Sequence, residues 1–244
     1  MKNKPSILFQ NDTIVAMDKP AGFLSVPDRY HEDKPSLASV ILAEFPTARP
    51  LHRLDFETSG VVLFCIVPEA FGWYSDQFEK RTISKRYTAI TEGRMLRDEG
   101  LIDEPLFTLT TGTVVISKRG KSSQTQWKLI EAFKHHSLVE ANPLTGRTHQ
   151  IRVHLSSIGH PIVGDTVYGS SGPLYLSSLK GKNKYRLSKD EEEERPLMSR
   201  IALHASGISF DDFTTGTRML VESGLPKDMK VTHAKLHQYS GLFK

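Results

Sequence analysis

Cysteine and long apolar runs are scarce in this sequence. Cys65 is the one cysteine among 244 residues, so no intrachain disulfide can form and a reducing compartment fits best. It lies in the apolar run 61–67, which indicates a buried thiol and not a nucleophile. No segment approaches the roughly 18 apolar residues of a membrane-spanning helix, and the first residues do not form a signal peptide. We therefore expect a cytoplasmic protein.

A strong excess of charge of either sign is also absent. Lys and Arg number 32 against 28 Asp and Glu, a net charge of +4. This mildly basic balance is compatible with a polyanionic partner, because Lys and Arg displace counterions from phosphates. A slightly basic protein without such a partner would have the same composition. The length of 244 residues allows one large domain or two small ones.

The apolar pattern of the first third predicts a hairpin, a helix and a buried strand. Two short apolar runs, 7–9 and 14–17, flank a polar turn and predict the hairpin. Apolar residues at helical spacing between 37 and 45, followed by Pro46, predict the helix. The continuous apolar run 60–67 is typical of a strand buried on both faces.

The remaining pattern predicts an α+β domain built on a mixed sheet. A helix is expected over 150–158, with Thr148 as its cap and Gly159 as its end. Short connections between β-branched runs predict antiparallel pairing. These runs lie at 87–91, 113–116, 125–130 and 137–141.

Residues 170–199 differ from their surroundings. Lysines and one arginine lead into the acidic run 190–194, a pattern typical of a solvated segment. We expect a mobile charged insertion outside the core. The whole chain, 1–244, is then a single domain.

The segment from Leu51 to Gly60 carries the densest chemical signal. His52, Arg53 and Asp55 lie directly before the predicted buried strand, and a loop held by a rigid strand is a common place for a catalytic group. An ordinary turn, in which Asp55 binds local amides, would give the same pattern.

A second segment, 142–155, joins a strand end to a glycine turn and a helix start. Backbone amides at such a helix start attract phosphate, and Arg147 and Arg152 add positive charge. His149 and His154 are five residues apart, about 140° around a helix, so they do not form the four-residue spacing of a zinc site. We expect no metal.

A basic pair, Lys85-Arg86, precedes Tyr87 in a third segment. Taken together and in order, these segments closely resemble the RluA-type branch of the RNA pseudouridine synthases. The matching motifs are Lys19-Pro20-Ala21-Gly22, His52-Arg53-Leu54-Asp55, Thr58-Ser59-Gly60, Lys85-Arg86-Tyr87-Thr88-Ala89, Gly146-Arg147-Thr148-His149-Gln150-Ile151-Arg152, Gly159-His160-Pro161-Ile162-Val163-Gly164-Asp165 and Leu203-His204-Ala205.

The resemblance implies a mixed, largely antiparallel sheet with flanking helices and a central cleft. It implies isomerisation of uridine to pseudouridine without a cofactor, on a uridine flipped out of its stack. Asp55 would be the catalytic carboxylate and Arg152 its cleft partner. Tyr87 would pack against the target base and help to remove the carbon 5 proton.

Substrate contacts are expected from Arg53, His52, Arg147 and Leu203. Arg53 would enter the RNA and Leu203 would close the pocket. The catalytic pattern begins near the first residue, so no separate N-terminal RNA-binding domain is expected. The implied partner is a stem-loop of ribosomal or transfer RNA, whose loop presents splayed bases, bound by a monomer.

Two other classes of function share parts of this pattern. A glycoside hydrolase also places a carboxylate beside a glycosidic bond, but it needs a second carboxylate about 5 to 9 Å away, and no motif here positions one. An RNA-binding protein without catalysis would use the same basic residues. The fate of uridine when Asp55 is replaced distinguishes these classes.

Overall fold

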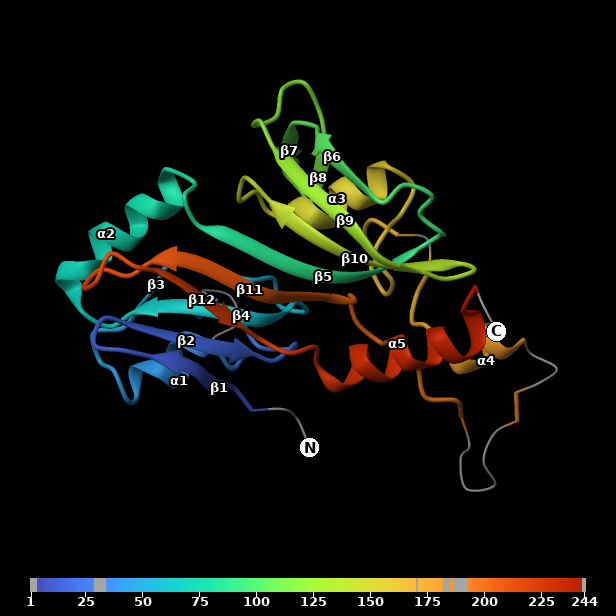
Figure 1. Cartoon of the computed structure of the whole chain (residues 1–244), viewed down its shortest axis with the longest axis horizontal. Coiled ribbons are helices and arrows are strands. Elements are labelled where there is room, and N and C mark those ends of the chain that lie inside the picture. Colours follow the sequence, from blue (N-terminus) through green and yellow to red (C-terminus); the bar gives the residue numbers. More distant parts are fainter. Residues whose placement is uncertain (1–3, 29–33, 170, 182–184, 187–192, 243–244) are drawn as a thin grey trace. The chain divides into compact units, whose positions relative to one another are not determined.

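The computed structural model describes residues 4–28, 34–169, 171–181, 185–186 and 193–242. The chain divides into two compact units (Figure 1). Unit 1 comprises the chain up to Tyr87 together with His204–Gly224, and unit 2 comprises Thr88–Leu203 and the chain from Leu225 onward. Strands β5 (Ser84–Glu92) and β11 (Leu203–Asp211) contribute residues to both units. No helix in the described ranges is long and apolar enough to span a membrane.

Unit 1 is a sheet with the strand order β1-β2-β4-β11-β5, with β3 beside β4 and β12 beside β11. Strands β2 and β4 pair in antiparallel fashion, whereas β4 and β11 run parallel. The elements of this unit besides β5 and β11 are β1 (Ser6–Gln10), β2 (Ile14–Lys19), α1 (Leu37–Leu42), β3 (Arg49–Pro50), β4 (Ser59–Cys65), α2 (Pro68–Glu79) and β12 (Arg218–Glu222).

Unit 2 is a sheet with the order β5-β10-β9-β6 and a separate β7–β8 hairpin. Helix α3 packs on β9 and β10, and α4 lies beside α5 (Figure 1). Its elements are β6 (Glu99–Asp103), β7 (Leu106–Thr108), β8 (Val114–Ile116), β9 (Gln124–Ala132), β10 (His136–Pro143), α3 (Gln150–Ser157), α4 (Leu176–Lys180) and α5 (Lys227–Ser240). The fold is therefore the expected α+β class with a mixed, mostly antiparallel sheet.

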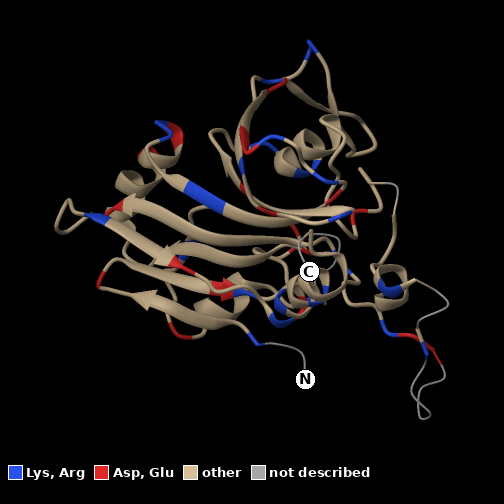
Figure 2. Cartoon of the chain, turned by 45° about the vertical axis from the view of Figure 1, so that its right-hand side comes forward, with Lys and Arg blue, Asp and Glu red and all other residues tan. Residues whose placement is uncertain are grey.

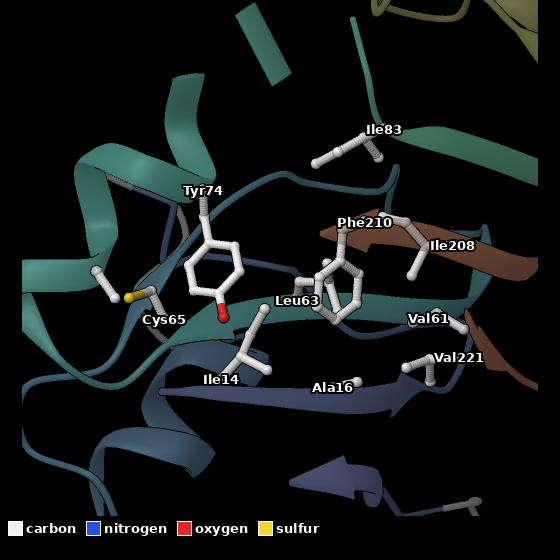
Figure 3. Close-up of a cluster of buried hydrophobic side chains, with 11 residues drawn as sticks. Ile14, Ala16, Val61, Leu63, Cys65, Tyr74, Ile83, Ile208, Phe210 and Val221 are labelled. Carbon is white, nitrogen blue, oxygen red and sulfur yellow. The ribbon is translucent and has the colours of Figure 1, made fainter. Parts of the chain in front are cut away.

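Strand β4 is buried along its whole length, as its apolar run predicts. Alternate residues point to opposite faces of a strand, so Val61 and Leu63 enter one core and Val62 and Phe64 enter another. Figure 3 shows the first core, in which the Tyr74 ring of α2 lies over β4. Burial raises the pKa of the Cys65 thiol above its ordinary value. This strand is thus a rigid support for the loop that precedes it.

The start of α3 differs from the prediction. Thr148 is not the cap; the N-cap is His149, which has φ +53° and makes no side-chain capping bond. The preceding turn is instead held by Gln150, whose side-chain Oε1 accepts from the Thr145 hydroxyl (2.6 Å) and the Arg147 amide (3.0 Å). The end of the helix is as expected, because Gly159 follows with φ +83°.

The expectation that residues 170–199 lie wholly outside the core is wrong at both ends of the segment. Leu174 and Met198 form a bridge and are buried, Met198 completely. Their apolar side chains anchor the segment to unit 2, because burying them is more favourable than exposing them. The lysines of 182–184 and the acidic residues 190–192, on which the prediction of mobility depends, lie outside the described residues.

Candidate active site

Asp55 lies in the loop between β3 and β4, and its side chain is half-buried. The Asp55 carbonyl oxygen accepts from the Thr58 amide at 3.1 Å, which closes a tight turn. The loop enters from β3 through a hydrogen bond between the Leu51 amide and the Leu63 carbonyl (3.0 Å). Both ends of the loop are therefore tied to the buried strand β4.

A buried lysine holds the same loop from the other side. Lys19, at the end of β2, is fully buried, and its ammonium group donates to the carbonyl oxygens of Pro20 (3.2 Å), Phe23 (2.7 Å) and Phe56 (3.2 Å). The Gly22 amide donates to the same Phe56 oxygen at 2.9 Å. A buried charge needs such partners, because desolvation is otherwise costly. The Lys-Pro-Ala-Gly motif thus supports the residue next to Asp55.

Ser25 holds the residue on the other side of Asp55. Its hydroxyl accepts from the Leu54 amide at 2.9 Å and donates to the Leu54 carbonyl oxygen at 3.0 Å. The positions before and after Asp55 are therefore both fixed by side chains of one segment, 19–25. Rigid support of this kind keeps a reacting group in a productive orientation.

The Ser59-Gly60 and His204-Ala205 motifs form one parallel contact between β4 and β11. The Ser59 hydroxyl lies 3.0 Å from His204 Nδ1, and His204 Nε2 lies 3.1 Å from the Ser223 carbonyl oxygen. Gly60 has φ +113°, and a Cβ there would lie 2.7 Å from the Ala205 backbone N and C. Only glycine permits this approach, so the two motifs depend on each other.

Tyr87 lies in the same unit, on β5, and packs against the cluster that contains Leu54 and Ala205. Burial raises the pKa of the Tyr87 phenol well above its ordinary value, and the neighbouring charge of Asp55 raises it further. The ring is therefore neutral at physiological pH. A neutral phenol offers an apolar face and a hydrogen-bond donor, and the expected part of Tyr87 in proton removal stays a prediction.

His52 faces β4 and α2. Its Nε2 accepts from the Leu63 amide at 3.1 Å, and its ring lies 5.3 Å from that of Phe78. Burial, and then the charge of Lys85, lowers the pKa of His52 to about 3. The imidazole is thus neutral, and it accepts from the Leu63 amide a hydrogen bond that a carbonyl oxygen of a neighbouring strand would otherwise accept. Arg53, the next residue, is exposed.

In unit 2, Arg152 forms a buried two-point ion pair with Asp165. Its Nε and Nη2 lie 2.7 and 3.0 Å from the carboxylate oxygens, and its guanidinium lies 4.9 Å from the Tyr168 ring. Burial alone would raise the pKa of Asp165, but the Arg152 hydrogen bonds and charge, with the Tyr168 and Val167 amides, bring it below its ordinary value. This pair keeps the guanidinium oriented.

The sequence did not reveal the role of Asp165. The sequence shows Gly164-Asp165 only as part of a matching motif. The structure adds the physical reason for the glycine: Gly164 has φ +80°, and a Cβ there would clash with the Arg200 backbone.

The histidines around α3 have separate partners. His149 Nδ1 lies 2.8 Å from the Tyr168 hydroxyl, and the two nitrogens of His154 lie 2.9 and 3.0 Å from Thr125 Oγ1 and the Glu104 carbonyl oxygen. His160 Nδ1 lies 3.0 Å from the Glu92 carbonyl oxygen. Within the described parts of the chain, no group of three or more ligating side chains is placed to hold a metal ion.

The expected site residues thus belong to two units. Asp55, Arg53, His52 and Tyr87 are in unit 1, where Asp55 and Tyr87 are neighbours. The others, Arg147, Arg152 and Leu203, are in unit 2. Arg147 is half-exposed at the turn before α3 and Leu203 is buried. The expected pairing of Arg152 with Asp55 stays a prediction.

Comparison with known proteins identifies a consistent set of relatives. A family described as RNA pseudouridylate synthase matches residues 13–157. The chain is 35% identical over 217 residues to a "Dual-specificity RNA pseudouridine synthase RluA" of Yersinia pestis, covering 87% of the chain and 95% of that protein. A protein of the same name from Escherichia coli K12 is 39% identical over 217 residues, covering 87% and 90%.

The fold has a solved counterpart. The human protein "RNA Pseudouridylate Synthase Domain Containing 4" superposes with a TM-score of 0.74 at 24% identity, over 95% of this chain and 93% of that one. This likeness concerns the fold, which is the one that the resemblance implied.

Proposed function

Because the chain belongs to the RNA pseudouridylate synthase family and isomerises uridine in RNA to pseudouridine, we propose that Asp55 is its catalytic carboxylate. The observation that carries the proposal is the rigid loop. Asp55 is half-buried, the residues on both sides of it are hydrogen-bonded to segment 19–25, and the half-buried ring of Tyr87 lies close enough for the two to interact electrostatically.

This geometry suits the reaction. The N-glycosidic bond of uridine breaks, the freed uracil rotates, and the ring rejoins the sugar through carbon 5. An ionised carboxylate can serve as nucleophile or as base in this sequence, and either task needs it held in one orientation. Tyr87, kept neutral by burial and by Asp55, supplies a flat face for the uracil and a donor for its oxygens.

The remaining expected residues have supporting roles in the proposal. Arg152, oriented by Asp165, brings the positive charge that favours an ionised carboxylate. Arg53 is exposed on the loop that carries Asp55 and is suited to hold the target nucleotide out of its stack. Arg147 contacts phosphate, Leu203 closes the apolar side of the uracil pocket, and His52 supports the loop through its bond to Leu63.

The substrate that we propose is a stem-loop of ribosomal or transfer RNA. Dual-specificity relatives of nearly the same length support this class, and a loop uridine costs less to flip than a stacked one. The protein then acts as a monomer, in the cytoplasm, without a cofactor. The mild basicity, +4 over 244 residues, supplies the attraction to phosphate.

Replacement of the carboxylate tests the proposal. Asp55→Asn keeps the shape and loses the charge, so it should form no pseudouridine, while the Kd for RNA changes by less than about tenfold, roughly 1.4 kcal/mol. Glu57→Gln, two residues along the same loop and exposed, is the matched control and should keep turnover. A melting curve for each variant shows that it is folded. A folded Asp55→Asn protein that still converts uridine at a comparable rate would disprove the assignment.

A further inference from the structure

A cavity of about 560 Å³ lies within unit 2. Its walls come from α4, the end of α5, the turn between β9 and β10, and residues 171–174. The described residues that line it include none of those assigned above to the uridine site. Its size is within the range of pockets that bury a small ligand or a nucleotide.

The walls of this cavity are held by backbone hydrogen bonds. The Lys134 amide donates to the Ser240 carbonyl oxygen at 2.8 Å, which joins the β9–β10 turn to the end of α5. On the other side, the Leu174 amide donates to the Met198 carbonyl oxygen at 2.8 Å, and both residues are buried. Backbone hydrogen bonds therefore fix two walls of the cavity relative to each other and to buried residues of unit 2.

Two lysines, Lys134 and Lys180, line the cavity together with one carboxylate, Glu92; Figure 2 marks all described Lys and Arg of the chain in blue. The Lys180 ammonium lies 4.9 Å from the centroid of the Tyr239 ring, and that of Lys235 lies 5.8 Å from the same centroid. Lys134 lines the turn. In the part of the chain that the structure describes, none of these three lysines forms an ion pair. Cations grouped in this way favour an anion between them.

Aromatic rings complete the lining. Tyr175 and Tyr239 are both half-buried there, together with the imidazole of His136. Among the described residues, His136 Nδ1 has no hydrogen-bond partner although it is buried. Rings beside lysines are the usual combination for a nucleotide, because the ring stacks on a base and the ammonium binds its phosphate.

We propose that this cavity binds a nucleotide of the substrate RNA other than the target uridine. The base stacks on Tyr239, and the adjacent phosphate lies between Lys134 and Lys180. Glu92, which also lines the cavity, accepts from the ribose 2′-hydroxyl, a group that distinguishes RNA from DNA. The inference rests on the RNA substrate but not on the role of Asp55, so the two can fail separately.

Paired lysine substitutions test the phosphate contact. In Lys134→Ala/Lys180→Ala, the Kd for substrate RNA should rise about tenfold, and the slope of log K against log salt should fall in magnitude by about 0.7 to 0.9, because one phosphate is no longer neutralised. Turnover at saturating RNA should not change. The matched control, Lys128→Ala/Lys230→Ala, removes the same charge from exposed positions of unit 2 outside the cavity, and should change the Kd by less than threefold.

Tyrosine substitutions test the stacking contact. Tyr239→Ser should weaken RNA binding about fivefold or more, whereas Tyr239→Phe should bind as the parent does, because the ring stacks without its hydroxyl. Equal Kd values for the cavity and control lysine pairs, or equal binding by Tyr239→Ser and Tyr239→Phe, would overturn the proposal. Repeating the titrations in an Asp55→Asn background keeps this result independent of catalysis.

Discussion

Replacing Gly60 with alanine should destabilise the protein at the point where the active-site loop joins β4. The added Cβ would lie 2.7 Å from the Ala205 backbone N and C, and closer still to its carbonyl oxygen. The backbone atoms of a paired strand cannot avoid the clash by changing rotamer, as a side chain can. Gly60→Ala therefore has to separate β4 from β11 or distort both strands.

Two costs contribute to the expected loss of stability. Holding alanine at φ +113° costs on the order of 1–3 kcal/mol, and forcing an extra methyl group into a filled core costs about 1–3 kcal/mol. Their sum, about 2–6 kcal/mol, is a large part of the 5–15 kcal/mol that stabilises a typical protein. At roughly 2–4 °C per kcal/mol for a chain of this size, we expect the melting temperature to fall by about 4–24 °C.

Thermal unfolding followed by circular dichroism measures this change, and a pseudouridine assay well below the melting temperature measures its effect on the loop. Turnover should fall as well, because Ser59 and Gly60 carry the end of the loop that holds Asp55. Gly72→Ala is the matched control. Gly72 lies inside α2, and a Cβ there meets nothing within 4 Å, so alanine should add about 0.5–1 kcal/mol of stability. A Gly60→Ala protein that melts with the parent would refute the reasoning.

Other predictions concern the charges that support the site. Lys19→Met removes the donor from the carbonyl oxygens of Pro20, Phe23 and Phe56, of which the last keeps its bond from the Gly22 amide. At about 1–3 kcal/mol for each buried acceptor left unsatisfied, the melting temperature should drop, and turnover should fall more than RNA affinity in a binding titration. Asp165→Asn should cost about 3–5 kcal/mol in urea unfolding, since it removes the charge of one partner from a buried ion pair with Arg152, and a variant as stable as the parent would contradict this. The pKa of His52, lowered to about 3, lies below its unfolded value near 6.5. The stabilisation of the folded state by neutral His52 is therefore complete above pH 6.5 and is lost as the pH falls toward 3, by at most about 1.4 kcal/mol per pH unit. His52→Gln should flatten the dependence of the unfolding free energy on pH in that window. An unchanged slope would exclude this role of His52.

Much of the local structure follows from sequence patterns alone. The apolar run 60–67 predicted a strand buried on both faces, and the hairpin of β1 and β2 and the helix that begins at Leu37 were found where their patterns placed them. Strands and helices of this kind depend on periodicity and local turn chemistry, which a sequence displays directly. The order of the motifs was also sufficient to identify the family and to single out Asp55.

Contacts between distant segments were decided by tertiary structure. Nothing near Lys19 in the sequence shows that its ammonium group binds the Phe56 carbonyl oxygen, and nothing near Gly60 shows that Ala205 lies against it. Nothing near Arg152 in the sequence shows that its guanidinium forms a buried ion pair with Asp165, and its expected pairing with Asp55 stays a prediction. The charged segment after residue 170 was expected to leave the core, yet Leu174 and Met198 are buried. Each of these depends on which backbone groups meet when the chain is packed, and that pairing is set by long-range burial and hydrogen bonding and not by any local pattern.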